Sequence, residues 1–188
     1  MFDASSSPAQ FEPATYGRRV AEILALDGAG RRLMPLASGT CSCEEALKRL
    51  KDGSPRELFP GARAPEAAMA GLYLYFSCLN EAHSIAQEIE TPDGSFWHGI
   101  MHRQQPDAGN AGYWFRRAGR HPIFQALCDA ANRLGYAAGS VWDPIAFVDA
   151  CEEARRHPGS DRELLVRKVQ LIEWQLLFDH CAREGSAK

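Results

Sequence analysis

Residues 161–183 read DRELLVRKVQLIEWQLLFDHCAR, and this stretch decides the fold class. Its apolar side chains cover a wide arc of the predicted helix: Leu164, Leu165, Val169, Leu171, Ile172, Trp174, Leu176, Leu177 and Phe178. A helix that is apolar most of the way round lies in the centre of a fold or at a subunit interface. We favour the centre, and a homodimer interface is the alternative.

The rest of the chain has the same helical periodicity. No alternating run of β-branched residues is long enough to predict a sheet. Helices are predicted over residues 16–26, 43–51, 55–59, 65–89, 95–105, 109–118, 121–134, 144–156 and 161–183. We therefore expect an all-α protein, a single-domain helical bundle or irregular array of about seven to nine helices. The domain should span residues 14–188 and follow a loose, Ser- and Pro-rich segment at 1–13.

Several helix boundaries carry recognisable signals. Four helix starts have capping residues or an N-terminal proline: Ser42 with Glu45, Ser54-Pro55 with Glu57, Asp143-Pro144, and Ser160 with Glu163. The sequence Thr91-Pro92-Asp93-Gly94 is typical of a turn, and it is expected to end the 65–89 helix.

The composition is that of an ordinary globular protein, with 45% hydrophobic and 24% charged residues. A net charge of −3 argues against nucleic-acid binding, which usually needs a basic face. There is no apolar run of the roughly 18 residues that would predict a membrane span. The N-terminus lacks the basic start and apolar stretch of a secretory signal. We therefore expect a cytoplasmic protein without a membrane partner.

The cysteines and glycine-rich stretches do not predict a familiar site. Four cysteines fall among apolar residues at helical spacing, which predicts buried thiols: Cys78, Cys128, Cys151 and Cys181. Cys41-Ser42-Cys43 is too closely spaced for a thioredoxin-type motif and has no second pair to complete a zinc site. Gly28-Ala29-Gly30 follows a helix rather than a strand, so it predicts a turn and not a dinucleotide-binding loop.

Residues 80–122 hold four of the six histidines, namely His83, His98, His102 and His121. His98 and His102 are four residues apart, so on a helix both imidazoles point the same way. Such a pair commonly supplies two ligands to a divalent metal, and His83 or Glu81 on the preceding helix is the candidate third ligand. A metal with an open position would activate a bound water. Without a metal, His98, His102 and Glu81 are candidate acid–base groups.

The same segment is rich in arginine and aromatic residues. Between His98 and His121 stand four arginines and one acid: Arg103, Arg116, Arg117, Arg120 and Asp107. Guanidinium groups bind phosphate or carboxylate through two hydrogen bonds, so Arg103, Arg116 and Arg117 are candidates to bind a small anionic molecule. Trp97, Tyr113 or Trp114 would cover the ring of a ligand that has one. Asn80 belongs to a polar strip expected to form one wall of the pocket.

Residues 94–103 read GSFWHGIMHR, and they are followed by Pro106-Asp107, Asn110, YWFRR at 113–117, and His121-Pro122. With Leu79-Asn80-Glu81-Ala82-His83 upstream, this pattern resembles a family of uncharacterised bacterial and fungal proteins with a WHxIMHR…PD…N…YWFRR.G.HP core. The resemblance covers residues 79–122 and implies no reaction.

Two functional hypotheses follow. The first is an enzyme or binding protein for a small anionic ligand, with a pocket rich in histidine and arginine that works with or without a divalent metal. The second is a non-catalytic interaction or structural module. Burial separates them, because His98, His102, Arg103 and Arg116 around an open cavity would favour a ligand, whereas full pairing in the core would favour a structural role.

Overall fold

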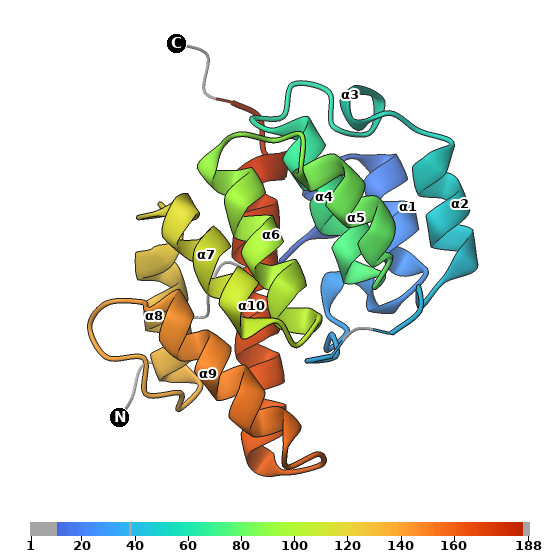
Figure 1. The fold of residues 1–188 in the computed structure, drawn as a ribbon. Coiled ribbons are helices and arrows are strands. Elements are labelled where there is room, and N and C mark those ends of the chain that lie inside the picture. Colours follow the sequence, from blue (N-terminus) through green and yellow to red (C-terminus); the bar gives the residue numbers. More distant parts are fainter. Residues whose placement is uncertain (1–10, 38, 186–188) are drawn as a thin grey trace, which may run out of the picture.

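The computed structural model describes residues 11–37 and 39–185, and helices are its dominant secondary structure. The described residues form ten α-helices, no strand, and one isolated bridge between Ala62 and Glu184 (Figure 1). The helices are α1 (Arg18–Ala25), α2 (Glu44–Lys51), α3 (Pro55–Leu58), α4 (Pro65–Tyr75), α5 (Leu79–Ala86), α6 (Pro92–Gln104), α7 (Ala108–Ala118), α8 (Phe124–Arg133), α9 (Pro144–Arg155) and α10 (Asp161–Ala182). The all-α prediction is confirmed.

Helix α10 is the central element, as its apolar arc predicted. It packs against α4, α8 and α9, and in Figure 1 it runs through the middle of the molecule behind α6. Its C-terminal half supplies Trp174 and Phe178 to the larger hydrophobic cluster, and its N-terminal half supplies Val166 and Val169 to a smaller one. The indole Nε1 of Trp174 donates a hydrogen bond to the Gly71 carbonyl at 2.8 Å. The apolar arc is therefore largely covered within one chain.

Of the N-terminal segment predicted to be loose, the structure describes only residues 11–13. Residues 1–10 of the segment predicted to be loose lie outside the described residues. Phe11, however, packs against Tyr16 and Trp174, with ring centroids 5.5 and 5.4 Å apart. A short 3-10 turn, Pro13–Tyr16, follows directly. The prediction of a loose chain is therefore wrong for residues 11–13, because an aromatic contact with α10 holds them.

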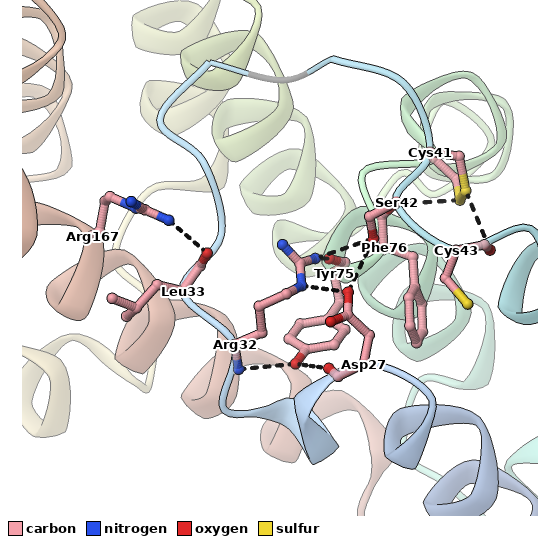
Figure 2. Close-up of polar contacts among 10 residues, drawn as sticks. Asp27, Arg32, Leu33, Cys41, Ser42, Cys43, Tyr75, Phe76 and Arg167 are labelled. Atoms are coloured by element: carbon pink, nitrogen blue, oxygen red, sulfur yellow. Dashed lines mark hydrogen bonds and ion pairs between the residues drawn. A yellow bond between two sulfur atoms is a disulfide. The ribbon is translucent and has the colours of Figure 1, made fainter. Parts of the chain in front are cut away.

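Three of the four predicted helix starts are confirmed. Ser54 and Glu57 form a reciprocal capping box at α3, Asp143 accepts backbone N–H bonds at α9, and Ser160 accepts one at α10. The capping box predicted at Ser42 is wrong, because Cys43 is the N-cap residue of α2 and makes no side-chain cap. Ser42 instead donates its backbone N–H to the Phe76 carbonyl at 2.7 Å and its Oγ–H to Asp27 at 3.1 Å (Figure 2).

The single helix predicted over 65–89 is two helices. The chain breaks between α4 and α5, where Ser77 adopts the left-handed conformation with φ of 59°. The turn predicted at residues 91–94 is instead the start of α6, in which Thr91 caps the Gly94 N–H and Pro92 occupies the first helical position. Proline is compatible with that position because its missing N–H has no partner there.

The long connection between α1 and α2 is anchored to the end of α4. Tyr75 accepts a hydrogen bond from the Arg32 backbone N–H at 3.0 Å and donates one to the Asp27 carbonyl at 2.5 Å (Figure 2). The Arg32 guanidinium pairs with the Asp27 carboxylate at 2.5 Å and also binds the Tyr75 carbonyl. These contacts hold the first half of the connection against α4.

The cysteine prediction holds for three residues and fails for one. Cys128, Cys151 and Cys181 are buried free thiols, as expected. Cys78, also predicted to be a free thiol, forms a disulfide with Cys41. Helical spacing predicted the burial of Cys78, but it carried no information on a partner in the connection between α1 and α2.

No described helix is long and apolar enough to cross a membrane.

Candidate functional site

Three histidines from two helices converge, as the sequence predicted. We call His83 on α5 with His98 and His102 on α6 the three-histidine cluster. The ring centroids lie 4.9 Å apart for His83 and His98, 6.0 Å for His83 and His102, and 6.2 Å for His98 and His102. The two α6 rings are stacked, because residues four apart project from the same face of a helix.

His98 is the most unusual member of the cluster. It is 1% exposed and stacks on Trp114 of α7 with ring centroids 4.1 Å apart. Neither ring nitrogen has a hydrogen-bond partner of good geometry within the described chain. Burial, reinforced by the charge of His83, lowers the pKa of His98 to about 4, while the Gly94 carbonyl acts to raise it. His98 is therefore a buried, neutral imidazole at pH 7.

His102 has a similar character but lies nearer the surface. Its Nδ1 is buried without a hydrogen bond, and the Asp107 carboxylate lies 4.0 Å away. Burial lowers the pKa of His102, although Asp107 acts to raise it. Asp107 is engaged elsewhere, since it caps α7 by accepting the Asn110 N–H at 3.1 Å. Buried polar groups are normally paired, so unpaired imidazole nitrogens indicate a place for water, an ion or a ligand.

Positive charge lies beside the cluster at the C-terminal end of α7. The Arg117 guanidinium stands 5.4 Å from the centre of the Trp114 ring, and its charge acts to lower the pKa of His98. In the described part of the chain, none of Arg116, Arg117 and Arg120 forms an ion pair, and all three are exposed. Tyr113 is 50% exposed and meets Trp114 edge to face at 5.3 Å.

Arg103 does not belong to this site, and its predicted role in neutralising a substrate is wrong. It is fully buried and makes a two-pronged ion pair with Glu173 of α10. Although burial acts to lower the pKa of Arg103, the Glu173 carboxylate raises it above its usual value. The guanidinium also lies over the Phe147 ring at 4.7 Å. Arg103 therefore links α6 to α10 inside the core.

Three other predicted residues also lie apart from the cluster. Trp97 is fully buried in the larger hydrophobic cluster, so it is not placed to cover a ligand. Glu81 pairs with Lys51 at 2.8 Å, and this interaction lowers its pKa. Asn80 and Glu81 line a surface cleft with Cys41 and Cys78. Within the described part of the chain, neither side chain is hydrogen-bonded or ion-paired to the three-histidine cluster.

A second cluster was missed by the sequence reasoning. Asp93, in the first turn of α6, is 5% exposed. Its Oδ1 lies 2.9 Å from His121 Nε2 and 3.4 Å from His180 Nε2. Arg63 binds its other oxygen at 2.6 Å. Burial acts to raise the pKa of Asp93, but the two histidines and Arg63 outweigh it and hold that pKa well below its usual range. We call these four residues the Asp93 cluster.

The Asp93 cluster meets the geometry of a metal site more closely than the three-histidine cluster does. One ligand atom each of Asp93, His121 and His180 lies within 4.8 Å of the others, and among the described residues this is the one group that meets that criterion. Its three candidate ligands come from α6, α10 and the segment before α8, and Arg63 precedes α4, so no local spacing in the sequence could have joined them. A metal at the three-histidine cluster would require its rings to turn.

No protein-family model, curated protein or solved structure matches this chain. The resemblance stated for residues 79–122 therefore stays a prediction that rests on its motif residues.

Proposed function

We propose that the protein binds a small anionic molecule at the three-histidine cluster, next to Trp114 and Arg117. The observation that carries the proposal is His98, a buried imidazole whose ring nitrogens have no hydrogen bond of good geometry within the described chain. It stacks on an indole that also contacts Arg117, which has no acidic partner among the described residues. A bound anion would supply the missing hydrogen-bond acceptor to the imidazoles and the missing counter-charge to Arg117.

The chemistry available at this site is proton transfer together with charge neutralisation. A neutral imidazole has one N–H donor and one lone pair, so His98 and His102 can each hydrogen-bond to a ligand or accept a proton from it. Arg117 would neutralise the ligand, and the half-buried His83 would close the site from α5. His98 and His102 are our candidates for acid–base groups if the bound molecule is also a substrate.

A thermal-shift titration with inorganic phosphate and simple dicarboxylates tests this proposal. We expect at least one anion to raise the melting temperature of the wild type, because ligand binding stabilises the folded state. The rise should be lost in His98→Gln and Arg117→Gln, and it should persist in the control Arg133→Gln, which changes an exposed arginine on α8. No shift with any anion, or equal shifts in all four proteins, would contradict the proposal.

A second candidate function is the binding of a divalent metal by Asp93, His121 and His180, which is favoured by the proximity of their ligand atoms. Two imidazoles and a carboxylate suit zinc or ferrous iron. A competing arrangement is purely structural, because the Ile123 N–H points to His121 Nδ1 at 3.5 Å and thereby favours an Nε2–H that donates to Asp93.

Titration with Co²⁺ distinguishes these two arrangements, because tetrahedral cobalt has visible absorption bands that report its ligands. Metal binding predicts one equivalent of bound Co²⁺ in the wild type, lost in Asp93→Asn and His180→Ala and retained in His157→Ala, which removes an exposed histidine. The structural arrangement predicts equal, weak binding by all four proteins. It also predicts that Asp93→Asn lowers the free energy of unfolding.

A further inference from the structure

The Cys41–Cys78 disulfide lies at a surface cleft and has a third cysteine close by. Both cysteines line a cleft of about 590 Å³, together with Ser77, Asn80 and Gln105. Cys41 is partly exposed and Cys78 is buried, so a thiol entering from solvent would reach the Cys41 sulfur first. Cys43, two residues away, is a free and partly exposed thiol.

The two neighbours of Cys41 are placed for different roles in thiol–disulfide exchange. Cys78 is the N-cap residue of α5, and a helix N-terminus stabilises a thiolate and so improves it as a leaving group. The Cys43 carbonyl oxygen lies 3.8 Å from the Cys41 sulfur, so the Cys43 backbone is already next to the disulfide. In Figure 2 the Cys43 sulfur points away from that of Cys41, so a side-chain rotation must precede a reaction between them.

Contacts other than the disulfide also hold the connection between α1 and α2 in place. Asp27, Arg32 and Tyr75 anchor its first half, and the Ser42 N–H binds the Phe76 carbonyl between the two cysteines of the Cys41-Ser42-Cys43 motif (Figure 2). The chain around Cys41 would therefore stay docked when the S–S bond opens. A bond that can open without unfolding its surroundings is suited to exchange.

We propose that Cys41–Cys78 is a redox-active disulfide that oxidises thiol compounds, with Cys43 as the alternative partner of Cys41. The thiolate of a small thiol attacks the Cys41 sulfur, a mixed disulfide forms, and Cys78 leaves with the electron pair as a thiolate. The Cys43 thiolate then attacks the same sulfur and forms Cys41–Cys43, and the small thiol is released. Two further thiols reduce that bond in two exchanges, so they become one disulfide and the protein gains two electrons and two protons.

The other free cysteines do not compete for this chemistry. Cys151 and Cys181 are fully buried, and burial raises the pKa of Cys151 to about 11 and that of Cys181 further. The thiolate is the reactive form, so a raised pKa makes a cysteine inert. Cys128 is also buried, and its thiol faces the Gly139 carbonyl at 3.4 Å. Cys128 is therefore a suitable control position.

The experiment is peptide mapping by mass spectrometry after incubation of the folded protein in buffers of reduced and oxidised glutathione, followed by rapid alkylation. In the wild type we expect three linked forms, namely Cys41–Cys78, Cys41–Cys43 and a Cys41–glutathione mixed disulfide. In Cys43→Ser only Cys41–Cys78 and the mixed disulfide should remain, because Cys43 can no longer attack the Cys41 sulfur and Cys78 alone resolves the mixed disulfide. Cys128→Ser should match the wild type. Far-UV circular dichroism confirms that each variant is folded.

Two results would overturn the inference. A Cys41–Cys78 bond that resists glutathione in the folded protein and opens only in denaturant would be a structural disulfide. The absence of a Cys41–Cys43 species in partly reduced wild type would remove Cys43 from the reaction, and this measurement does not depend on any variant.

Discussion

At the scale of single residues, the difference between Arg103 and His98 separates a structural role from a functional one. Both were predicted as site residues, and both are fully buried on α6. Arg103 has its charge matched by Glu173, whereas His98 has no partner of good geometry for either ring nitrogen. A buried group that is fully paired stabilises the fold, and one that is unpaired is a candidate for binding.

The Arg103–Glu173 pair should be strongly coupled. Arg103→Met leaves the Glu173 carboxylate buried without a counter-charge, and we expect a loss of about 3–5 kcal/mol in the free energy of unfolding. The double variant Arg103→Met/Glu173→Leu should recover much of that loss, because no charge is then buried. Urea denaturation of the wild type, Arg103→Met, Glu173→Leu and the double variant measures the coupling. The control Arg156→Met breaks an exposed pair with Glu153 and should change little. Equal effects of Arg103→Met and Arg156→Met would contradict the prediction.

His98 should make stability depend on pH. Its pKa is about 4 in the folded protein, against about 6.5 for a histidine in an unfolded chain, so between these two values the unfolded chain binds more protons. The free energy of unfolding should therefore be highest above pH 6.5, fall as the pH is lowered, and level off below pH 4. The contribution of His98 is at most about 3 kcal/mol.

The comparison of His98→Leu with the wild type isolates this contribution, since carboxylates also titrate in that range. His83, His102 and Arg117 remain in the variant and act on the same site. We expect a shallower fall in stability for His98→Leu, and no change in slope for the exposed control His157→Leu. Identical pH profiles for wild type and His98→Leu would mean that His98 is not desolvated in solution.

At the scale of elements, the contact between α6 and α7 positions the candidate site, and Gly99 sets how closely the two helices approach. An added Cβ at Gly99 would lie 2.8 Å from the buried Phe115 ring, which is too close for a rigid neighbour. Gly99→Ala should therefore destabilise the protein by about 1–3 kcal/mol, even though alanine favours a helix. Gly109→Ala on α7 is the control, because its nearest atom lies 3.7 Å away. In thermal unfolding, the melting temperature of Gly99→Ala should fall below that of the wild type, and that of Gly109→Ala should stay clearly higher than that of Gly99→Ala.

The elements also show what the sequence can and cannot predict. Helix starts with local capping residues, such as Ser54, Asp143 and Ser160, were predicted correctly because the deciding contacts lie within four residues. The break at Ser77 was missed because the apolar periodicity continues through it, and the Ser42 N–H that binds Phe76 there comes from a distant loop.

In the candidate site, too, local contacts were predictable from the sequence and long-range contacts were not. The shared orientation of His98 and His102 was predictable from helix geometry, and the sequence placed His83 near them. The partner of Arg103 lies 70 residues away, and the Asp93 cluster joins four separate segments. Thr91-Pro92-Asp93-Gly94 was read as a turn, although threonine followed by proline is also typical of a helix start. Long-range pairs of this kind leave no periodic signal.

At the scale of the whole molecule, α10 is shared by both hydrophobic clusters, and this should make unfolding cooperative. The larger cluster is built mainly from the segments up to α7, and the smaller one from α8, α9 and the loop between them. Because Val166 and Val169 of α10 lie in the smaller cluster and Trp174 and Phe178 in the larger, neither cluster can lose α10 without exposing the other.

A perturbation of the smaller cluster should therefore destabilise the larger one by the same amount. Phe147 is fully buried in the smaller cluster, and Phe147→Ala should lower the free energy of unfolding by about 3–5 kcal/mol. Hydrogen exchange by mass spectrometry in increasing urea measures each helix separately. We expect α4, α6 and α9 to lose protection at one common urea concentration, and Phe147→Ala to move all three together. If α9 loses protection first while α4 keeps its wild-type midpoint, α8 and α9 form a separately unfolding unit. The three-histidine cluster would then belong to the larger unit alone.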